Sequence, residues 1–146
     1  MRNKPILSEK EEAIGKAIVN AAYKVHKKLG PGLLEKVYEI CLAYELEKAG
    51  YKVKRQTFIP IMYDHMQFDE GLKLDILVED LVIVETKAVE TVSPIWVAQI
   101  VSHMKLLDKR LGYLINFDVA LIKDGIRRFV NFAAVHENPR EDAQLY

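Results

Sequence analysis

Residues 81–84 (LVIV) place the strongest constraint on the fold, because they are apolar on both faces of any strand that they form. Such a run is typical of a central strand that is covered on both sides by other elements. A second apolar run, residues 74–78, precedes it, and the polar residues 85–87 (ETK) follow it directly. The sequence therefore predicts helices on both faces of a sheet and polar side chains at the end of its central strand.

Helical periodicity lies on both sides of these runs. Ser8 and Glu11 form a capping-box pattern that opens a helix to about residue 29, where Gly30-Pro31-Gly32 ends it. A second helix runs from about residue 33 to Gly50, and Ser93-Pro94 opens a third that reaches about residue 109. The apolar faces of the second and third helices consist of Leu34, Val37, Tyr38, Cys41 and Leu42, and of Val97, Ile100, Val101, Met104 and Leu107.

The remaining strands follow from alternation and apolar runs. Residues 53–61 alternate as a strand, with Pro60 indicating an edge or a strand end, and residues 63–71 are polar and typical of turns. Residues 112–117 and 126–132 predict two more strands around a turn at 123–125. The order α-α-β-β-β-α-β-β predicts an α/β fold with a central mixed β-sheet flanked by helices. We expect one domain, residues 1–135, and a polar tail, residues 136–146.

Composition excludes several classes of function. Lys plus Arg and Asp plus Glu each total 21, which argues against coating nucleic acid by bulk charge, although local basic groups remain possible phosphate contacts. These groups, which are equally typical of a solvated surface, are Lys52, Lys54 and Arg55, then Lys105, Lys109 and Arg110, then Arg127 and Arg128. A lone Cys41 and scattered histidines make a disulfide or a zinc site improbable. Without a signal peptide or membrane span, we expect a cytoplasmic protein.

The acidic residues near the central strand predict a metal site. Glu85 and Lys87 are two apart, so they share one face of a strand. If residues 79–81 form a three-residue turn, Val78 pairs with Val82 and Asp75 falls opposite Glu85, with Cβ atoms about 5 Å apart. Two carboxylates at that distance suit Mg²⁺ or Mn²⁺, and Lys87 could position or deprotonate a water. A two-residue turn would instead put Asp75 on the other face.

Simpler interpretations remain open for each residue. Asp75 could form a structural salt bridge with Lys87 while Glu85 stays solvated. Glu35 and Tyr38 share one face of the second helix, but an acid in a first turn is common because it suits the helix dipole. Gln99 and His103 share a face of the third helix, which is also typical of a polar outer surface.

The combination of these motifs resembles the GxxExxY protein family, which is grouped with the PD-(D/E)XK nuclease-like superfamily. It consists of Gly32-x-x-Glu35-x-x-Tyr38, Asp75, Glu85-x-Lys87, Ala98-Gln99 and residues 114–117 (LINF), and it extends from about residue 16 to 131. The resemblance implies a restriction-endonuclease-like core. Two residues depart from the family pattern. His103 stands where a tyrosine is expected after Gln99, and Thr86 replaces the usual leucine between Glu85 and Lys87.

The resemblance also implies roles for individual residues. Asp75, Glu85, Glu35 and the Thr86 carbonyl would bind Mg²⁺ or Mn²⁺. Lys87 and Gln99, with Glu35, would be catalytic, and we expect Tyr38, His103 and Lys105 to contact substrate.

Two functions follow from this assignment. The first is a metal-dependent phosphodiesterase, a nuclease acting on DNA or RNA. The alternative is a non-catalytic module that keeps the nuclease-like fold for protein interaction or assembly into homo-oligomers. Nucleotide-loop chemistry is not supported, because the sequence has neither GxGxxG nor a Walker-type glycine loop.

Overall fold

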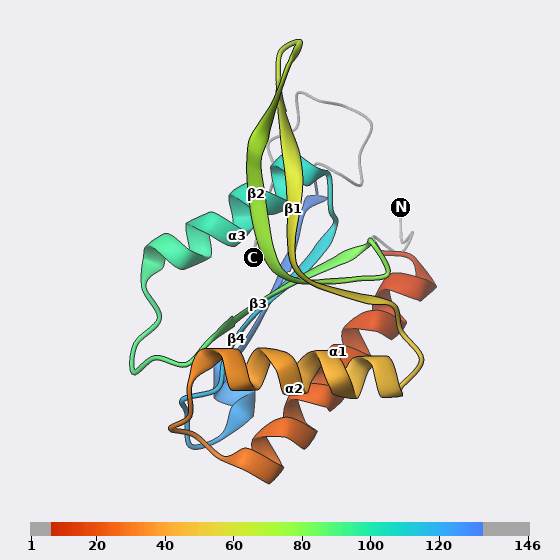
Figure 1. The fold of residues 1–146 in the computed structure, drawn as a ribbon. Coiled ribbons are helices and arrows are strands. Elements are labelled where there is room, and N and C mark those ends of the chain that lie inside the picture. Colours follow the sequence, from red (N-terminus) through yellow and green to blue (C-terminus); the bar gives the residue numbers. More distant parts are fainter. Residues whose placement is uncertain (1–6, 133–146) are drawn as a thin grey trace, which may run out of the picture.

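The computed structural model describes residues 7–132, in which five strands form one sheet in the order β1-β2-β3-β4-β5 (Figure 1). The strands are β1 Val53–Tyr63, β2 Met66–Val78, β3 Val82–Lys87, β4 Leu111–Asn116 and β5 Ile126–Val130, and the helices are α1 Glu9–Leu29, α2 Glu35–Lys48, α3 Pro94–Leu107 and the short η1 Ile122–Gly125. β3 and β4 pair in parallel, and the other neighbours are antiparallel. The predicted element order and the mixed α/β sheet are confirmed, while the predicted tail lies outside the described residues.

Helices cover both faces of the sheet, as the apolar central strand requires. α1 and α2 lie on one face, where they pack against side chains such as Val82 and Val84. α3 covers the other face, where Ile100 and Met104 join Ile83 and Leu77 in a second cluster. Alternate side chains of β3 thus enter different clusters, and the helix that connects β3 to the parallel strand β4 is α3.

The beginnings of the first two helices show one prediction confirmed and one wrong. Ser8 caps α1, because its side chain accepts from the Glu11 backbone while the Glu11 carboxylate accepts from the Ser8 N–H. At α2 we expected Leu34 in the core, but it is the N-cap residue and 78% exposed. The apolar face of α2 begins one turn later at Tyr38, which stacks on Phe117 with ring centroids 4.6 Å apart.

The prediction of a turn-rich segment at residues 63–71 is wrong. β1 and β2 form a long hairpin that projects beyond the rest of the sheet (Figure 1), and Asp64 and His65 form its turn. The pairing register shifts between Ile59 and Ile61, on either side of Pro60, which fits a residue with no N–H for the ladder. Opposite this shift a Cβ at Gly71 would overlap the Ile59 carbonyl, so the close approach requires glycine.

The turn between β2 and β3 has the three-residue form on which the metal-site prediction depends. Val78 pairs with Val82, and the pairs Leu77–Ile83 and Ile76–Val84 continue the same register. Glu79 and Asp80 adopt φ values of 54° and 56°, a left-handed conformation that Asp tolerates better than most residues. The alternative two-residue turn is excluded. No described helix is long and apolar enough to cross a membrane.

Candidate active site

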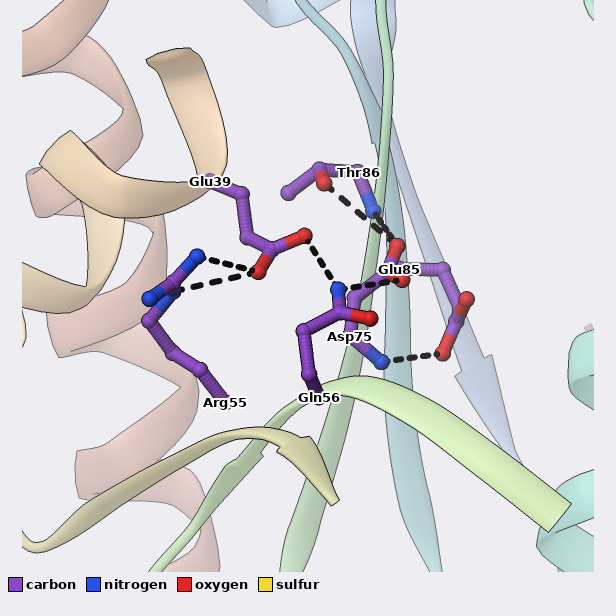
Figure 2. Close-up of polar contacts among 6 residues, drawn as sticks. All are labelled: Glu39, Arg55, Gln56, Asp75, Glu85 and Thr86. Carbon is purple, nitrogen blue, oxygen red and sulfur yellow. Dashed lines mark hydrogen bonds and ion pairs between the residues drawn. The ribbon is translucent and has the colours of Figure 1, made fainter. Parts of the chain in front are cut away.

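The β2–β3 ladder ends at Ile76–Val84, and one step beyond it acidic side chains take over the backbone hydrogen bonds. The Asp75 N–H donates to Glu85 Oε2 over 3.3 Å, and the Thr86 N–H donates to Asp75 Oδ2 over 3.0 Å. The Thr86 hydroxyl donates to the same oxygen over 3.4 Å. Figure 2 shows these contacts between neighbouring strands. The predicted proximity of Asp75 and Glu85 is therefore present, because each carboxylate binds the backbone of the opposite strand.

A second set of polar residues reaches Asp75 from β1 and α2, and the sequence did not reveal it. Gln56 donates to Asp75 Oδ1 over 3.4 Å and to Glu39 Oε1 over 2.7 Å, while Arg55 forms an ion pair of 2.9 Å with Glu39 (Figure 2). Gln56 has a φ of 48°, which interrupts the regular alternation of β1. Because that conformation has no signature at a glutamine, alternation alone could not place its side chain toward the site.

The two strand carboxylates, Asp75 and Glu85, are partly buried, and no ion-paired cation contacts either of them among the described residues. Burial raises the pKa of Glu85 to about 8, and the neighbouring Asp75 charge raises it further than burial alone would. Burial also raises the pKa of Glu35, which lies in the first turn of α2. The Lys87 charge lowers this pKa, and the charges of Asp75 and Glu39 raise it. Glu35 thus lies within the electrostatic reach of Asp75 and Lys87. The site concentrates negative charge that a bound cation could offset.

Lys87 ends β3 on the same face as Glu85, and it is not the partner of Asp75. Its Nζ lies 4.5 Å from the centroid of the Trp96 ring, and no described ion pair joins it to Asp75. The structural salt bridge that we considered is therefore absent. The Phe117 N–H donates to the Lys87 carbonyl, and Asn116 bonds both backbone groups of Val89, which fixes the chain after β3.

Gln99 and His103 occupy different environments on α3. Gln99 is exposed and lines a groove of about 540 Å³ between α3 and Leu72 of β2. His103 also lines it, but only 8% of its surface is exposed, so the outer-surface interpretation is wrong for this residue. Burial lowers the pKa of His103, and the Asp75 charge opposes this change. His103, and with it one end of the groove, therefore lies within electrostatic range of the Asp75 carboxylate.

Two of the three predicted substrate contacts are not at this site. Tyr38 is 0% exposed, and its hydroxyl donates to the Gly30 carbonyl over 2.5 Å and accepts from the Leu33 N–H over 3.1 Å. A substrate contact does not fit this position, because the hydroxyl instead fixes the loop before α2. Lys105 is exposed in the last turn of α3 and does not line the groove.

Several of the basic residues considered as phosphate contacts have acidic partners. Arg110 binds Glu11 over 2.8 Å, Arg128 binds Glu12 over 3.1 Å, and Arg55 binds Glu39. Lys54 pairs with Asp80 over 3.2 Å. These pairs reduce the positive charge that Lys54, Arg55, Arg110 and Arg128 can offer to a polyanion.

The donor chemistry fits a hard divalent cation, but the ligand set is incomplete in this conformation. Asp75 and Glu85 supply oxygen ligands beside the Thr86 backbone, and carboxylate oxygens keep further lone pairs when they accept one hydrogen bond. Across residues 7–132, no three His, Cys, Asp or Glu side chains gather closely enough to hold a metal ion. Glu35 would therefore have to approach the pair to become a third ligand.

The comparisons with known proteins agree with this geometry. The sequence matches the profile of the PD-(D/E)XK nuclease superfamily over residues 12–129, which includes the carboxylate pair, Lys87 and the groove helix. No curated protein and no solved structure gives a match. The sheet with helices on both faces is consistent with that superfamily's fold. On the extent of this match, the chain belongs to the PD-(D/E)XK nuclease superfamily.

Proposed function

We propose that the protein is a metal-dependent phosphodiesterase of the GxxExxY type, which cleaves a nucleic acid with Mg²⁺ or Mn²⁺. The observation that carries this proposal is the contact between the partly buried residues Asp75 and Glu85 across β2 and β3, with Lys87 next on the same face. Superfamily membership supports the same reaction class. A structural pair of acids would be expected to have an arginine partner, and this pair has none among the described residues.

The proposed roles follow from position. Asp75, Glu85, the Thr86 carbonyl and Glu35 would hold the cation, which supplies charge stabilisation at the phosphate and lowers the pKa of a bound water. Lys87 would stabilise charge on the phosphate or orient the attacking water, because its ammonium is held over Trp96 rather than neutralised. Gln99 would orient substrate from the groove, since it is exposed there.

Cleavage assays with matched variants test this function. Purified protein is incubated with single- and double-stranded DNA and RNA in Mn²⁺ or Mg²⁺, and Mn²⁺ binding is measured by calorimetry. We expect cleavage and one Mn²⁺ site in the wild type, and loss of both in Asp75→Asn. Asp69→Asn, an exposed acid on the same strand, is the control and should retain both. Absence of cleavage and of Mn²⁺ binding in the wild type would overturn the proposal.

A non-catalytic binding module remains the second candidate, and one observation favours it. Both Asp75 oxygens already accept hydrogen bonds from Gln56 and Thr86, so the present arrangement satisfies them without a metal. This candidate requires that Asp75→Asn and Glu85→Gln leave both partner binding and stability nearly unchanged. The titration and unfolding experiments therefore discriminate between the two candidates.

A further inference from the structure

The groove beside α3 differs chemically from a surface that binds a phosphate backbone. It is lined by one tryptophan, three aliphatic residues, one alanine and three polar residues, namely Trp96, Leu72, Ile95, Leu106, Ala98, Gln99, Ser102 and His103. None of these side chains is a lysine or an arginine, and phosphate contacts rely mainly on such cations. Ile95 and Leu106 are largely exposed along it. The groove therefore suits a flat, mostly apolar group with a hydrogen-bonding edge.

One residue that lines this groove has a buried nitrogen without a hydrogen-bond partner among the described residues. His103 Nδ1 is buried and forms no hydrogen bond with the described residues, although the whole side chain is more than nine-tenths buried. An unsatisfied buried polar atom costs free energy, so a turn of the imidazole ring that brings Nδ1 to a ligand in the groove would be favoured. Gln99 and Ser102 add amide and hydroxyl groups close by along the helix. Together they offer the donors and acceptors that a base edge can use.

The groove is continuous with the proposed reaction centre. The Trp96 ring lines the groove and also contacts the Lys87 ammonium at 4.5 Å, while His103 lies within the electrostatic influence of Asp75. A phosphate at Lys87 would therefore place an attached nucleoside beside Trp96. Stacking on aromatic side chains is the usual way in which proteins hold unpaired bases, and it tolerates any sequence.

We infer that the groove between α3 and β2 holds an unpaired nucleobase next to the scissile phosphate, so that the nuclease acts on single-stranded nucleic acid. This inference rests on the proposed function, because it assigns the substrate class of the same site. Bases in an intact duplex are stacked and paired, and they could not enter the groove without being extruded.

The protein contains one tryptophan, and therefore its fluorescence reports on this groove directly. The full-length chain is titrated in EDTA, where the proposed cleavage does not proceed, with oligonucleotides of about 15 nucleotides. The probes are single-stranded DNA, single-stranded RNA, the matching blunt DNA duplex, and a DNA strand whose sugars all lack bases. We expect saturable quenching of Trp96 by both single strands, with about 10-fold weaker binding of the duplex and of the abasic strand.

Filling the groove provides the second measurement. Ser102→Phe and Ala98→Phe place a large side chain at exposed groove positions, and Asn20→Phe adds the same side chain at an exposed position of α1. Both groove variants should lose at least about 10-fold in single-strand affinity, while the α1 variant binds as the wild type does. Thermal melting of each variant confirms that it is folded.

The outcomes separate the two proposals. Cleavage of nucleic acid without Trp96 quenching, or with equal binding of duplex and single strand, would overturn the single-strand inference but not the proposed nuclease activity. Quenching by single strands without any metal-dependent cleavage would overturn the nuclease and keep the binding site. If the groove instead holds an apolar peptide side chain, no probe will quench Trp96, and the inference fails.

Discussion

A buried acid, Glu11, and a pair of partly buried acids, Asp75 and Glu85, differ in how their charge is compensated. Glu11, at 2% exposure, accepts from both Ser8 groups and binds Arg110 through two nitrogens, with distances of 2.8 and 3.0 Å. Asp75 and Glu85 face each other, and their hydrogen bonds come from neutral groups of Gln56, Thr86 and the Asp75 backbone. The first arrangement includes a cation within the protein, whereas the second has none among residues 7–132 and raises the pKa of Glu85 instead. Burial of an acid therefore does not identify its role, but its partner does.

Lys87 should show the largest effect, because in the proposed function its charge acts on the substrate, while within the described part of the fold it makes no ion pair. We expect Lys87→Met to reduce single-turnover cleavage by at least ~100-fold, since the positive charge near the phosphate is lost. The free energy of unfolding of this variant should differ from that of the wild type by less than about 1 kcal/mol, because Lys87 makes a ring contact and no described ion pair. Lys73→Met is the control, as Lys73 also lies over a ring, that of Phe58. Equal loss in both variants would contradict the assignment.

Glu11→Gln should give the largest loss of stability. The variant removes the charge that pairs with Arg110, and breaking a buried pair leaves the remaining charge without a partner. Because the Arg110 side chain is 34% exposed, we expect about 2 kcal/mol rather than the larger cost of a fully buried pair. Urea denaturation measures this, with exposed Glu12→Gln as the control, for which less than about 0.5 kcal/mol is expected. Cleavage per folded molecule should stay at the wild-type level.

Glu85→Gln should stabilise the metal-free protein, and only above a certain pH. The pKa of Glu85 is raised from 4.5 to about 8 in the folded state, so the folded protein binds the proton more tightly than the unfolded chain. Wild-type stability is therefore fully present below pH 4.5 and decreases as pH rises through 8. We expect the variant to exceed the wild type by about 1–2 kcal/mol at pH 9 and to equal it near pH 4.5. A difference independent of pH would show that its origin is neither the burial of the charged carboxylate nor its repulsion with Asp75.

Tyr38→Phe should have the smallest effect, and it tests whether the role of Tyr38 is structural. The phenylalanine keeps the stacking on Phe117 but loses the hydrogen bonds to Gly30 and Leu33. We expect a loss of about 1 kcal/mol in unfolding free energy and unchanged kcat/KM. A fall in kcat/KM with unchanged stability would instead show that Tyr38 acts in the reaction, as the sequence predicted.

The sequence was sufficient for the parts of the site that depend on period and register. Alternation put Glu85 and Lys87 on one face, and the three-residue turn brought Asp75 opposite Glu85. The capping box of α1 and the element order were also predictable, because local hydrogen bonding and apolar patterning determine them. These features are local, or they connect neighbouring strands through a short turn.

The features that sequence reasoning missed are set by tertiary contacts. Residues 63–71 carry polar side chains typical of a turn, yet backbone pairing extends the hairpin through most of this segment. Gln56 reaches Asp75, and Glu39 binds Gln56, only because β1 interrupts its alternation and α2 packs against the sheet. The motif Gly32-x-x-Glu35-x-x-Tyr38 combines an acid within electrostatic reach of Asp75 and Lys87 with a core tyrosine, so Glu35 and Tyr38 lie in different environments.

The Glu11–Arg110 pair also has a consequence for the order of assembly. The two residues are 99 positions apart, although Glu11 belongs to the first turn of α1. During synthesis, Ser8 can cap α1 as soon as the helix emerges. The Glu11 carboxylate, however, cannot pair with Arg110 until the chain has been extended to the start of β4. Contacts of such long separation close late and slow folding. The N-terminal helix therefore reaches its final stability only when the second half of the sheet is in place.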